Sequence, residues 1–505
     1  MASSNDVRYE RRAVLRHWYM TFCTQISKER QPPVVDIPAE DIFARPKEAY
    51  SAALEAYGPV IAVHRKGNLE YIVGPEYARY VLTCDKLFSF EQGSAAIMNL
   101  QPIMAITQGA LFQDLNEFVR EGIIARIDEI VYKIFPIYDR DGSFFVDAVR
   151  LSQQGQPQPD SFQHSRNTIS ETTLILLLGE AYVNERNMRI IEDVSNGMAE
   201  LTGQYQNFSF LGRYLPWLWV FLTWINVVLI KIPFGFLRLL GPQLWADVNQ
   251  FETNVASGIS PRDEPKNVLY HIVKTYSPDG RRIGLFRRIY IGVLLLCLIF
   301  AAVHTTTVVS QWVLFQLAAH QEYLAPLREE LLKIREEDDS GAMSLTAASL
   351  REAHLLDSFI REVMRLKGDT ISTMRFTTCD APLGEYIIPK GSFVTPMSCM
   401  VHENPETFGD EASDFNGFQW AEQNKDAAMT GATHIVFGLG RFACPGRPDD
   451  VYRADTEIKL IVLCLIGRAT PSLLEGRFEV TDPLNTVTQP PKGTLVFTPL
   501  EKPLL

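Results

Sequence analysis

The chain carries the stretch VFGLGRFACPGR from Val436 to Arg447, which is the most informative part of its sequence. Its one cysteine, Cys444, lies in a loop punctuated by glycine and proline, with an arginine on either side. Such a loop holds a thiolate rigidly and offers backbone N–H groups to the sulfur, a support that only a ligand or a nucleophile needs. The plainer interpretation is a small buried hydrophobic residue. The apolar run Ile458–Ile466 predicts a buried helix that carries the loop.

The composition of the chain argues against several classes of function. With 505 residues, of which 46% are hydrophobic, the chain can bury a large core. Its formal net charge of -12 argues against nucleic acid as a partner. The seven cysteines are scattered, without a C-x-x-C pair. This spacing argues against a disulfide framework or a zinc site and suits a reducing compartment.

A long apolar helix is predicted from Ile289 to His320, interrupted by the polar run His304–Thr307. Polar groups in a buried helix need partners, because burying them unpaired costs about 1–3 kcal/mol each. The threonines can donate to the carbonyl four residues earlier. Alternatively, the run lines an active-site groove.

The next predicted helix, Leu355–Leu366, has one apolar stripe and places Glu362 and Arg365 three residues apart on the same side. Taken alone, such an ion pair is usually a solvated surface feature of little energetic value. The segment FNGFQW follows downstream, from Phe415 to Trp420.

The Cys444 loop resembles the haem-ligand loop of the cytochrome P-450 family, which in fungal members typically reads F-G-x-G-R-H-x-C-P-G-R. Phe437, Gly440, Cys444 and Gly446 match this pattern, while Phe442 stands where the family has His or Arg. The other motifs also occur in the family's order: small residues followed by His-Thr-Thr, then E-x-x-R, then FNGFQW, then the Cys loop. The chain is therefore similar to fungal P-450 enzymes of specialised metabolism.

The resemblance implies roles for these residues. Cys444 would ligate the iron of haem b, and Phe437, Gly440 and Gly446 would shape the cofactor loop. Thr305 would bind dioxygen and help deliver protons, with His304, in the place of the family's acid, as their relay.

Glu362 and Arg365 would form the family's buried pair behind the haem. The third partner in that pair is an arginine in the family but Gln419 here, so we expect a weaker interaction. Arg375 would pair with a haem propionate, as the basic residue at this strand start does in the family. The family's second propionate partner, in a W-x-x-x-R pattern, is not recognisable, and Arg120 or Arg126 could take its place.

The resemblance implies a mainly α fold with a small β part, a single cytochrome P-450-like triangular fold with a buried haem over residues 31–505. The sequence places a hairpin at 60–73, short strands at 374–395 and 477–498, and a loop at 152–165. Residues 1–30 are dense in charge with interleaved aromatic residues, which predicts an amphipathic surface segment and no membrane anchor.

The apolar region 214–240 has two interpretations. It is either a buried helix pair or a segment that enters one membrane leaflet, with Trp217, Trp219 and Trp224 at the interface and Lys231 and Arg238 reaching toward water. The family's corresponding region lies near the substrate entrance and often touches the membrane. The resemblance therefore implies peripheral contact with the cytoplasmic face of the endoplasmic reticulum membrane.

The function implied by the resemblance is a haem-thiolate monooxygenase that oxidises a small apolar natural-product intermediate, such as a terpenoid, polyketide or alkaloid. Electrons would come from NADPH through a separate reductase, because the chain has no flavin or nicotinamide motif. One alternative keeps the haem but rearranges, couples or cyclises the substrate without oxygen insertion. Another is a haem-poor, catalytically impaired scaffold. The expected substrate-pocket walls are residues 88–112, 205–245, 301–305, 370–374 and 485–488.

Overall fold

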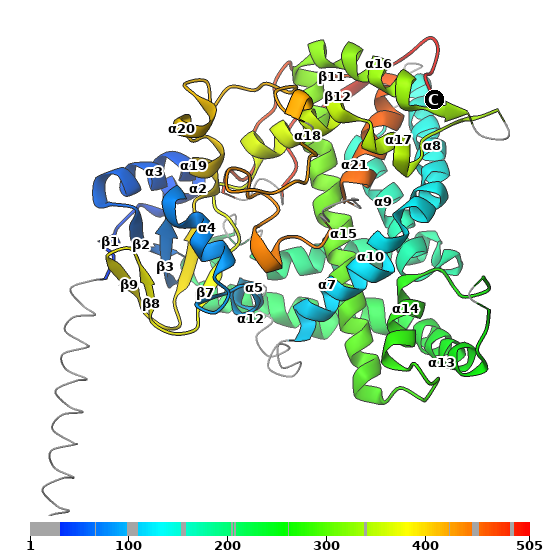
Figure 1. Ribbon diagram of the computed structural model, residues 1–505, viewed down its shortest axis with the longest axis horizontal. Helices are drawn as coiled ribbons and strands as arrows, with labels where there is room; N and C mark the ends of the chain where they lie inside the picture. Colours follow the sequence, from blue (N-terminus) through cyan, green and yellow to red (C-terminus); the bar gives the residue numbers. More distant parts are fainter. Residues whose placement is uncertain are drawn as a thin grey trace, which may run out of the picture.

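The computed structural model describes residues 31–65, 67–97, 110–152, 158–203, 206, 209–260, 262–337, 341–423, 425–446, 454–484 and 489–505. Figure 1 shows a body of helices with a small sheet region at one side, built from both the N-terminal part and the residues near 375–396. The predicted mainly α fold with a small β part is confirmed. The predicted amphipathic segment 1–30 and the pocket wall 485–488 lie outside the described residues.

The longer helices come from every part of the chain. They are α3 (Pro46–Tyr57), α4 (Pro75–Thr83), α5 (Phe90–Ile97), α7 (Ala110–Gly122), α8 (Ile127–Ser152), α9 (Ser161–Leu177), α10 (Glu185–Leu201), α12 (Pro216–Trp224), η4 (Ile225–Leu240, π-helical), α13 (Gly241–Ser257), α14 (Val268–Tyr276), α15 (Leu285–Ala319), α16 (Leu324–Ile334), α18 (His354–Lys367) and α21 (Ala454–Ile466).

Short helices fill the connections. They are α2 (Ala39–Ala44), η1 (Ile124–Arg126), η2 (Glu180–Tyr182), α11 (Phe210–Tyr214), η5 (Gln321–Tyr323), α17 (Ala347–Arg351), α19 (Ser398–His402), α20 (Pro405–Phe408), η6 (Ala421–Gln423) and η7 (Gly440–Phe442).

One mixed sheet of six strands has the order β1-β2-β3-β10-β7-β4. Its strands are β1 (Val34–Val35), β2 (Val60–Arg65), β3 (Asn68–Val73), β4 (Phe88–Ser89), β7 (Arg375–Thr377) and β10 (Phe393–Pro396). The hairpin predicted at 60–73 is confirmed as the antiparallel pair β2–β3. β10 lies parallel to β3 and antiparallel to β7, so the sheet joins residues far apart in the sequence.

Three two-stranded ribbons complete the β part. They are β5 (Glu336–Glu337) with β6 (Met343–Ser344), β8 (Ala381–Leu383) with β9 (Tyr386–Ile388), and β11 (Ala469–Leu473) with β12 (Leu495–Pro499). The prediction of strands at 477–498 is therefore only partly correct, because the first strand of the ribbon already begins at Ala469. Between the two strands, the described residues form one isolated bridge, of Glu479 with Lys492.

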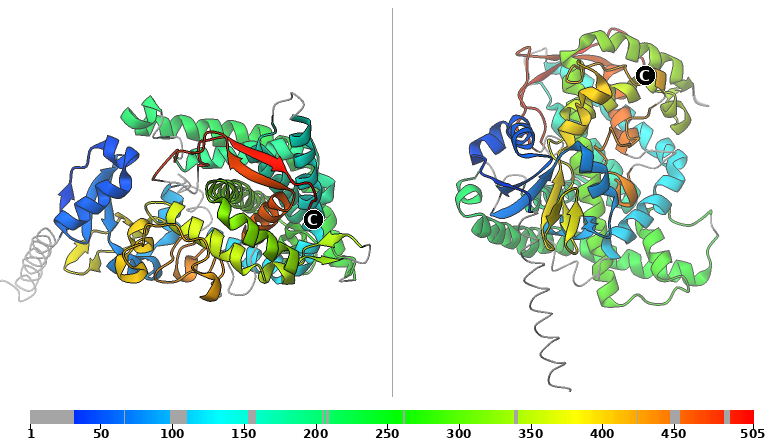
Figure 2. Two further views of the ribbon diagram at one scale, coloured as in Figure 1. Left: turned by 90° about the horizontal axis from the view of Figure 1, so that it is seen from above. Right: turned by 60° about the vertical axis from the view of Figure 1, so that its left-hand side comes forward.

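The central element is α15, which is seen end-on among its neighbours in the left panel of Figure 2. α9, α10, α18 and α21 all pack against it. The predicted helix 289–320 begins slightly earlier and ends one residue sooner, because His320 caps the end of α15. The predicted loop 152–165 is also shorter, because the Asp160 carboxylate accepts the N–H of Phe162 and starts α9 at Ser161.

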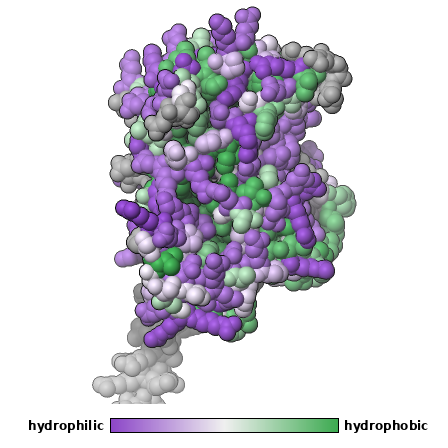
Figure 3. All heavy atoms as spheres, turned by 90° about the vertical axis from the view of Figure 1, so that its right-hand side faces the viewer, coloured by the Kyte–Doolittle hydropathy of each residue, from purple (hydrophilic) through white to green (hydrophobic). Residues whose placement is uncertain are grey.

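The apolar region near 214–240 forms one long helical stretch rather than a buried pair. Two described helices are long and apolar enough to cross a membrane: Pro216–Ser257, whose most apolar window is 11% buried, and Leu285–Ala319, whose window is 61% buried. Trp217 is 69% exposed and Phe221 58%. The buried-pair interpretation is therefore wrong, because this surface has no protein cover among the described residues. Figure 3 shows hydrophobic side chains gathered toward one edge of an otherwise largely hydrophilic face.

The two basic residues of this stretch, Lys231 and Arg238, lie in different surroundings. Lys231 was expected to reach toward water, but its Nζ pairs with Glu200 of α10 at 3.1 Å. This ion pair fastens the long stretch to the helical body, whereas Arg238 is exposed as expected.

Candidate functional site

An accessible stripe interrupts the buried surface of α15. Val293, Cys297, Ala301 and Thr305 are spaced four residues apart, so they share one face of the helix. Ala301 is exposed and the other three are half-buried, while the neighbouring residues on the other faces are largely buried. Burial raises the pKa of the Cys297 thiol to about 12. Val293 and Cys297 also pack against the main core, so the stripe is a partly accessible, mostly apolar face of α15.

Thr305 occupies the C-terminal end of this stripe. Its hydroxyl donates to the carbonyl of Ala301 at 2.8 Å, one turn earlier. Thr307 makes the same bond to Val303 at 2.6 Å but is buried on another face. Both threonines therefore donate to the carbonyl four residues earlier, as one interpretation of the polar run requires, and the active-site groove stays a prediction.

His304 is placed differently from its neighbour. Its ring is buried and lies nearly parallel to the Phe300 ring, with centroids 6.2 Å apart. Phe300 in turn packs against α10 and the long apolar stretch. His304 therefore lies on the side of α15 that faces these elements, next to Thr305 in the sequence but off the accessible stripe.

The Cys444 loop has the tight geometry that its sequence predicts. The N–H of Cys444 donates to the carbonyl of Phe437 at 2.7 Å and closes the loop. Gly440 has φ +75°, and a Cβ there would lie 3.2 Å from Thr83 Cγ2 and 3.3 Å from its Cα. Only glycine fits both the left-handed conformation and the close approach. Gly446 lies in the turn that follows Cys444, and Phe437 packs against the main core.

The elements around the loop bring it to the central helix. The 3-10 turn η7 at the start of the loop contacts α4, and α21 after the loop packs on α15. Figure 1 shows the orange segment of η7 beside the sheet region, with α15 next to it. Cys444 is half-buried and forms no disulfide. Its thiol is therefore held between the sheet side and the helical body.

Glu362 and Arg365 are buried and not solvated. Two parallel hydrogen bonds of 2.8 Å join the guanidinium to the carboxylate. The Gln419 amide donates to Oε2 of Glu362 at 2.5 Å, and the Trp420 indole N–H donates to the same oxygen at 3.1 Å. The pair thus joins α18 to the FNGFQW segment, with an amide where the resemblance implies a guanidinium.

Two buried histidines connect this pair to the Cys444 loop. Arg365 donates to the His402 carbonyl at 2.8 Å, and the His402 ring nitrogen Nε2 accepts the N–H of Ile435 at 3.0 Å. Ile435 is two residues before Phe437, so the hydrogen bonds run directly into the loop. His434 is also fully buried, and neither of its ring nitrogens has a hydrogen-bond partner among the described residues. Neither histidine belongs to a motif that the sequence indicated.

Arg375 is a fully buried cation. It donates to Thr373 Oγ1 at 2.9 Å and more weakly to the Leu82 carbonyl at 3.4 Å, while Nε has no partner. No carboxylate of the described residues forms an ion pair with it. Burial lowers the pKa of Arg375 to about 10, against the attraction of Asp85. A buried cation left without a counter-ion is costly, so this position calls for an anionic ligand.

Aromatic rings surround Arg375 in place of further cations. Phe442 stacks on Phe90 with centroids 5.2 Å apart, and the Arg375 guanidinium carbon lies 4.9 Å from the centroid of the Phe90 ring. Arg126 pairs with Glu129 at 3.0 Å, and the Arg120 side chain is 73% exposed. Neither arginine contacts the Arg375 group among the described residues.

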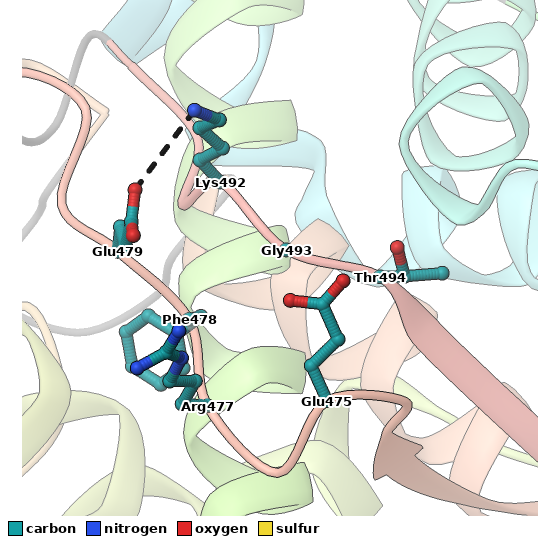
Figure 4. A pocket seen from close by; sticks show the side chains of 7 residues that line it. All are labelled: Glu475, Arg477, Phe478, Glu479, Lys492, Gly493 and Thr494. Carbon is teal, nitrogen blue, oxygen red and sulfur yellow. Dashed lines mark ion pairs between the residues drawn. The ribbon is translucent and has the colours of Figure 1, made fainter.

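The pocket in Figure 4 is separate from this site. It has a volume of about 330 Å³ and is lined by the segments between β11 and β12, including the ion pair of Glu479 and Lys492 at 3.9 Å. Phe478 anchors it to α15 by packing edge-on against Trp312 and Phe315. No residue of the accessible stripe or of the Cys444 loop lines it.

Comparison with known proteins agrees with this geometry. The chain is 30% identical over 230 residues to cytochrome P450 monooxygenase olcJ of Penicillium canescens, a match that covers 43% of this chain and 40% of the relative. It is 33% identical over 180 residues to cytochrome P450 monooxygenase terQ of Tolypocladium album, covering 33% and 30%. The matches thus span less than half the length of these fungal relatives.

The fold has a counterpart among solved structures. A retinoic acid-bound cyanobacterial CYP120A1 superposes with a TM-score of 0.61, covering 93% of this chain and all of that chain at 17% identity, which supports the fold alone. The cytochrome P450 family model matches residues 43–497, nearly the whole chain. The chain therefore belongs to the cytochrome P450 family.

Proposed function

We propose that the protein is a haem-thiolate monooxygenase with Cys444 as the axial ligand. The observation that carries the proposal is the accessible stripe ending at Thr305, in the part of α15 from Ile291 to Ala318 that is otherwise mostly buried. The closed Cys444 loop supports it, because the following helix, α21, packs on the same α15. A packed core helix with no site would bury this stripe. The family membership and the fungal monooxygenase relatives support the same activity.

The residues present fit a haem. Cys444 offers a thiolate in a tight loop whose turns require glycine, and Arg375 offers a buried cation without a counter-ion for an acidic side chain of the cofactor. When bound through a thiolate, haem supplies the activation of dioxygen. Phe437, Gly440 and Gly446 would shape the seat. Glu362 and Arg365 would hold the loop from behind through His402.

Thr305 and His304 would handle protons. The Thr305 hydroxyl donates to the carbonyl of Ala301 and can also accept a hydrogen bond, so it would pass a proton by switching its own donor bond. His304 would be the relay for these protons once its ring turns from Phe300 toward Thr305. In these roles the polar run would take part in catalysis, in addition to forming hydrogen bonds within the helix.

The substrate class follows from the stripe. Val293, Cys297 and Ala301 present small apolar groups on the accessible stripe, which suits an apolar molecule held by contact rather than by charge. We propose a small terpenoid, polyketide or alkaloid intermediate. The electrons would come from NADPH through a separate reductase, and the acidic net charge of -12 leaves nucleic acid without a role.

Peripheral membrane contact is part of the proposal. The long stretch from Pro216 exposes large apolar side chains along its length, and Arg238 is exposed beside them. Aromatic and aliphatic side chains next to a cation are typical of a segment at the surface of a bilayer. We therefore place the protein at the cytoplasmic face of the endoplasmic reticulum membrane, where an apolar substrate is also concentrated.

The source of oxygen in the product tests the activity. Terpenoid, polyketide and alkaloid compounds would first be screened for the change that each causes in the haem absorption band. The best binder would then be incubated with a reductase, NADPH and heavy-isotope dioxygen. One heavy oxygen atom per product molecule is expected. A rearranged or coupled product without label would contradict oxygen insertion and favour the alternative chemistry.

A further inference from the structure

Phe90 is the centre of a cluster that no sequence motif indicates. Its ring stacks on Phe442 at 5.2 Å and 19°, meets Phe112 edge-on at 5.2 Å, and lies 4.9 Å from the guanidinium carbon of Arg375. The four side chains come from α5, η7, α7 and β7. The haem loop, the sheet and two helices therefore meet at one aromatic ring.

Arg375, the buried cation at this cluster, has no ion-pair partner among the described residues. Arg375 is fully buried, its Nε has no partner, and the nearest acid that attracts it, Asp85, forms no ion pair with it. Arg441 lies 5.3 Å from the Phe442 ring, but its side chain is exposed, so solvent screens its charge. Arg375 is thus the one buried cation that contacts this cluster among the described residues.

We infer that Phe442 is a positioning residue for haem, which holds Phe90 against Arg375 so that this single desolvated guanidinium binds a carboxylate of the cofactor. The inference rests on the proposed function. An aromatic face attracts a guanidinium and restricts its orientations. A carboxylate that meets a guanidinium away from water binds it more strongly than it binds a solvated one. Phe442 thus takes the place of the cation that the family pattern has at this position, because it fixes the guanidinium of Arg375.

The test is the rate at which the protein loses haem to excess apomyoglobin. Arg375→Gln removes a charge-assisted bond and should speed the loss by about tenfold or more. Phe442→Leu should speed it by about threefold, and Phe442→Tyr, which keeps the ring, by less than about twofold. Phe393→Leu is the matched control, because it breaks a different aromatic contact, between Phe376 and Phe393 of the sheet, and leaves the Phe90 cluster unchanged.

Two further results separate positioning from general packing. In the Arg375→Gln background, Phe442→Leu should add no more than about twofold, because both changes act through one interaction. Iron protoporphyrin IX dimethyl ester, which lacks free carboxylates, should be lost at similar rates from wild type and Phe442→Leu. The inference would be overturned if the two substitutions multiply each other's effect on the rate of haem loss in the double variant. It would also be overturned if Phe442→Leu speeds the loss of haem and of its dimethyl ester equally. Failure of the wild type to bind haem at all would instead overturn the proposed function.

Discussion

The Gln419 amide donates to Oε2 of Glu362 at 2.5 Å, within the buried pair that Glu362 forms with Arg365. An amide gives this oxygen a hydrogen bond but no positive charge. The carboxylate is nevertheless fully satisfied, because the Trp420 indole and the N–H of Asn416 also donate to it. The junction behind the haem loop is therefore intact but carries one cation fewer than the family pattern.

Restoring the charge should strengthen this junction. Gln419 is half-buried, so an arginine there can keep part of its guanidinium in water. Because hydrogen bonds between charged groups are about twice as strong as neutral ones, Gln419→Arg should raise the free energy of unfolding by about 1 kcal/mol. Gln419→Met should lower it by a similar amount. Chemical denaturation measures both, and a destabilised Gln419→Arg variant would contradict the account.

Acid should weaken the protein through its buried histidines. Burial, together with Arg365 and Arg361, lowers the pKa of His402 to about 3 from 6.5, and the pKa of His434 is also lowered well below its usual value. Between about pH 3 and pH 6.5, His402 therefore binds a proton in the unfolded chain but not in the folded one. The free energy of unfolding should therefore fall as the pH drops below about 6.5, by about 1.4 kcal/mol per pH unit and histidine.

His434→Phe isolates this effect. The His434 ring makes no hydrogen bond among the described residues, so a ring of similar shape should keep the fold. Denaturation at pH 6.5 and 4.5 should show a smaller loss of stability on acidification for the variant than for the wild type. Equal losses for the two proteins would show that His434 is not the titrating group.

Thr305 and Thr307 form a matched pair for the oxygen chemistry. Both donate to the carbonyl four residues earlier, but only Thr305 lies on the accessible stripe. Thr305→Val should leave the fold within about 1 kcal/mol and lower the product formed per NADPH by about tenfold or more, because general acid–base groups contribute at least that much. Thr307→Val should keep the coupling. Full coupling in Thr305→Val would remove its proton role.

The exposed face at the start of the long helix should govern membrane binding. Charging Trp217 and Phe221 together, as W217E/F221E, removes two apolar anchors and should lower the fraction bound to phosphatidylcholine–phosphatidylserine vesicles by about tenfold. Tyr132→Glu is the control, because Tyr132 is 83% exposed on another helix, α8. If all proteins sediment equally with the vesicles, this face is not the contact.

The sequence predicted those parts of the site that depend on local spacing. The Cys444 loop, the Thr305 turn and the Glu362–Arg365 pair each need only residues close in the chain, and their geometry agrees with the spacing. The hairpin at 60–73 was predictable for the same reason. Its alternating apolar residues and central turn determine the pairing without any distant partner.

Contacts between distant segments could not be predicted. Nothing in the sequence pattern brings Phe90 to Phe442, because their contact depends on how α5 and the haem loop are arranged by the whole sheet. The same holds for His402 with Ile435. The buried-pair interpretation of 214–240 failed because an apolar period does not show whether another part of the protein covers the helix.

The absorption spectrum of the reduced protein with carbon monoxide tests whether Cys444 is the haem ligand. We expect the red-shifted Soret band of a thiolate-ligated haem in the wild type and its loss in Cys444→Ser. Cys464→Ser serves as the control, since Cys464 is buried in α21, outside the loop. A wild type without any haem band, or a Cys444→Ser variant that keeps the shifted band, would contradict the account.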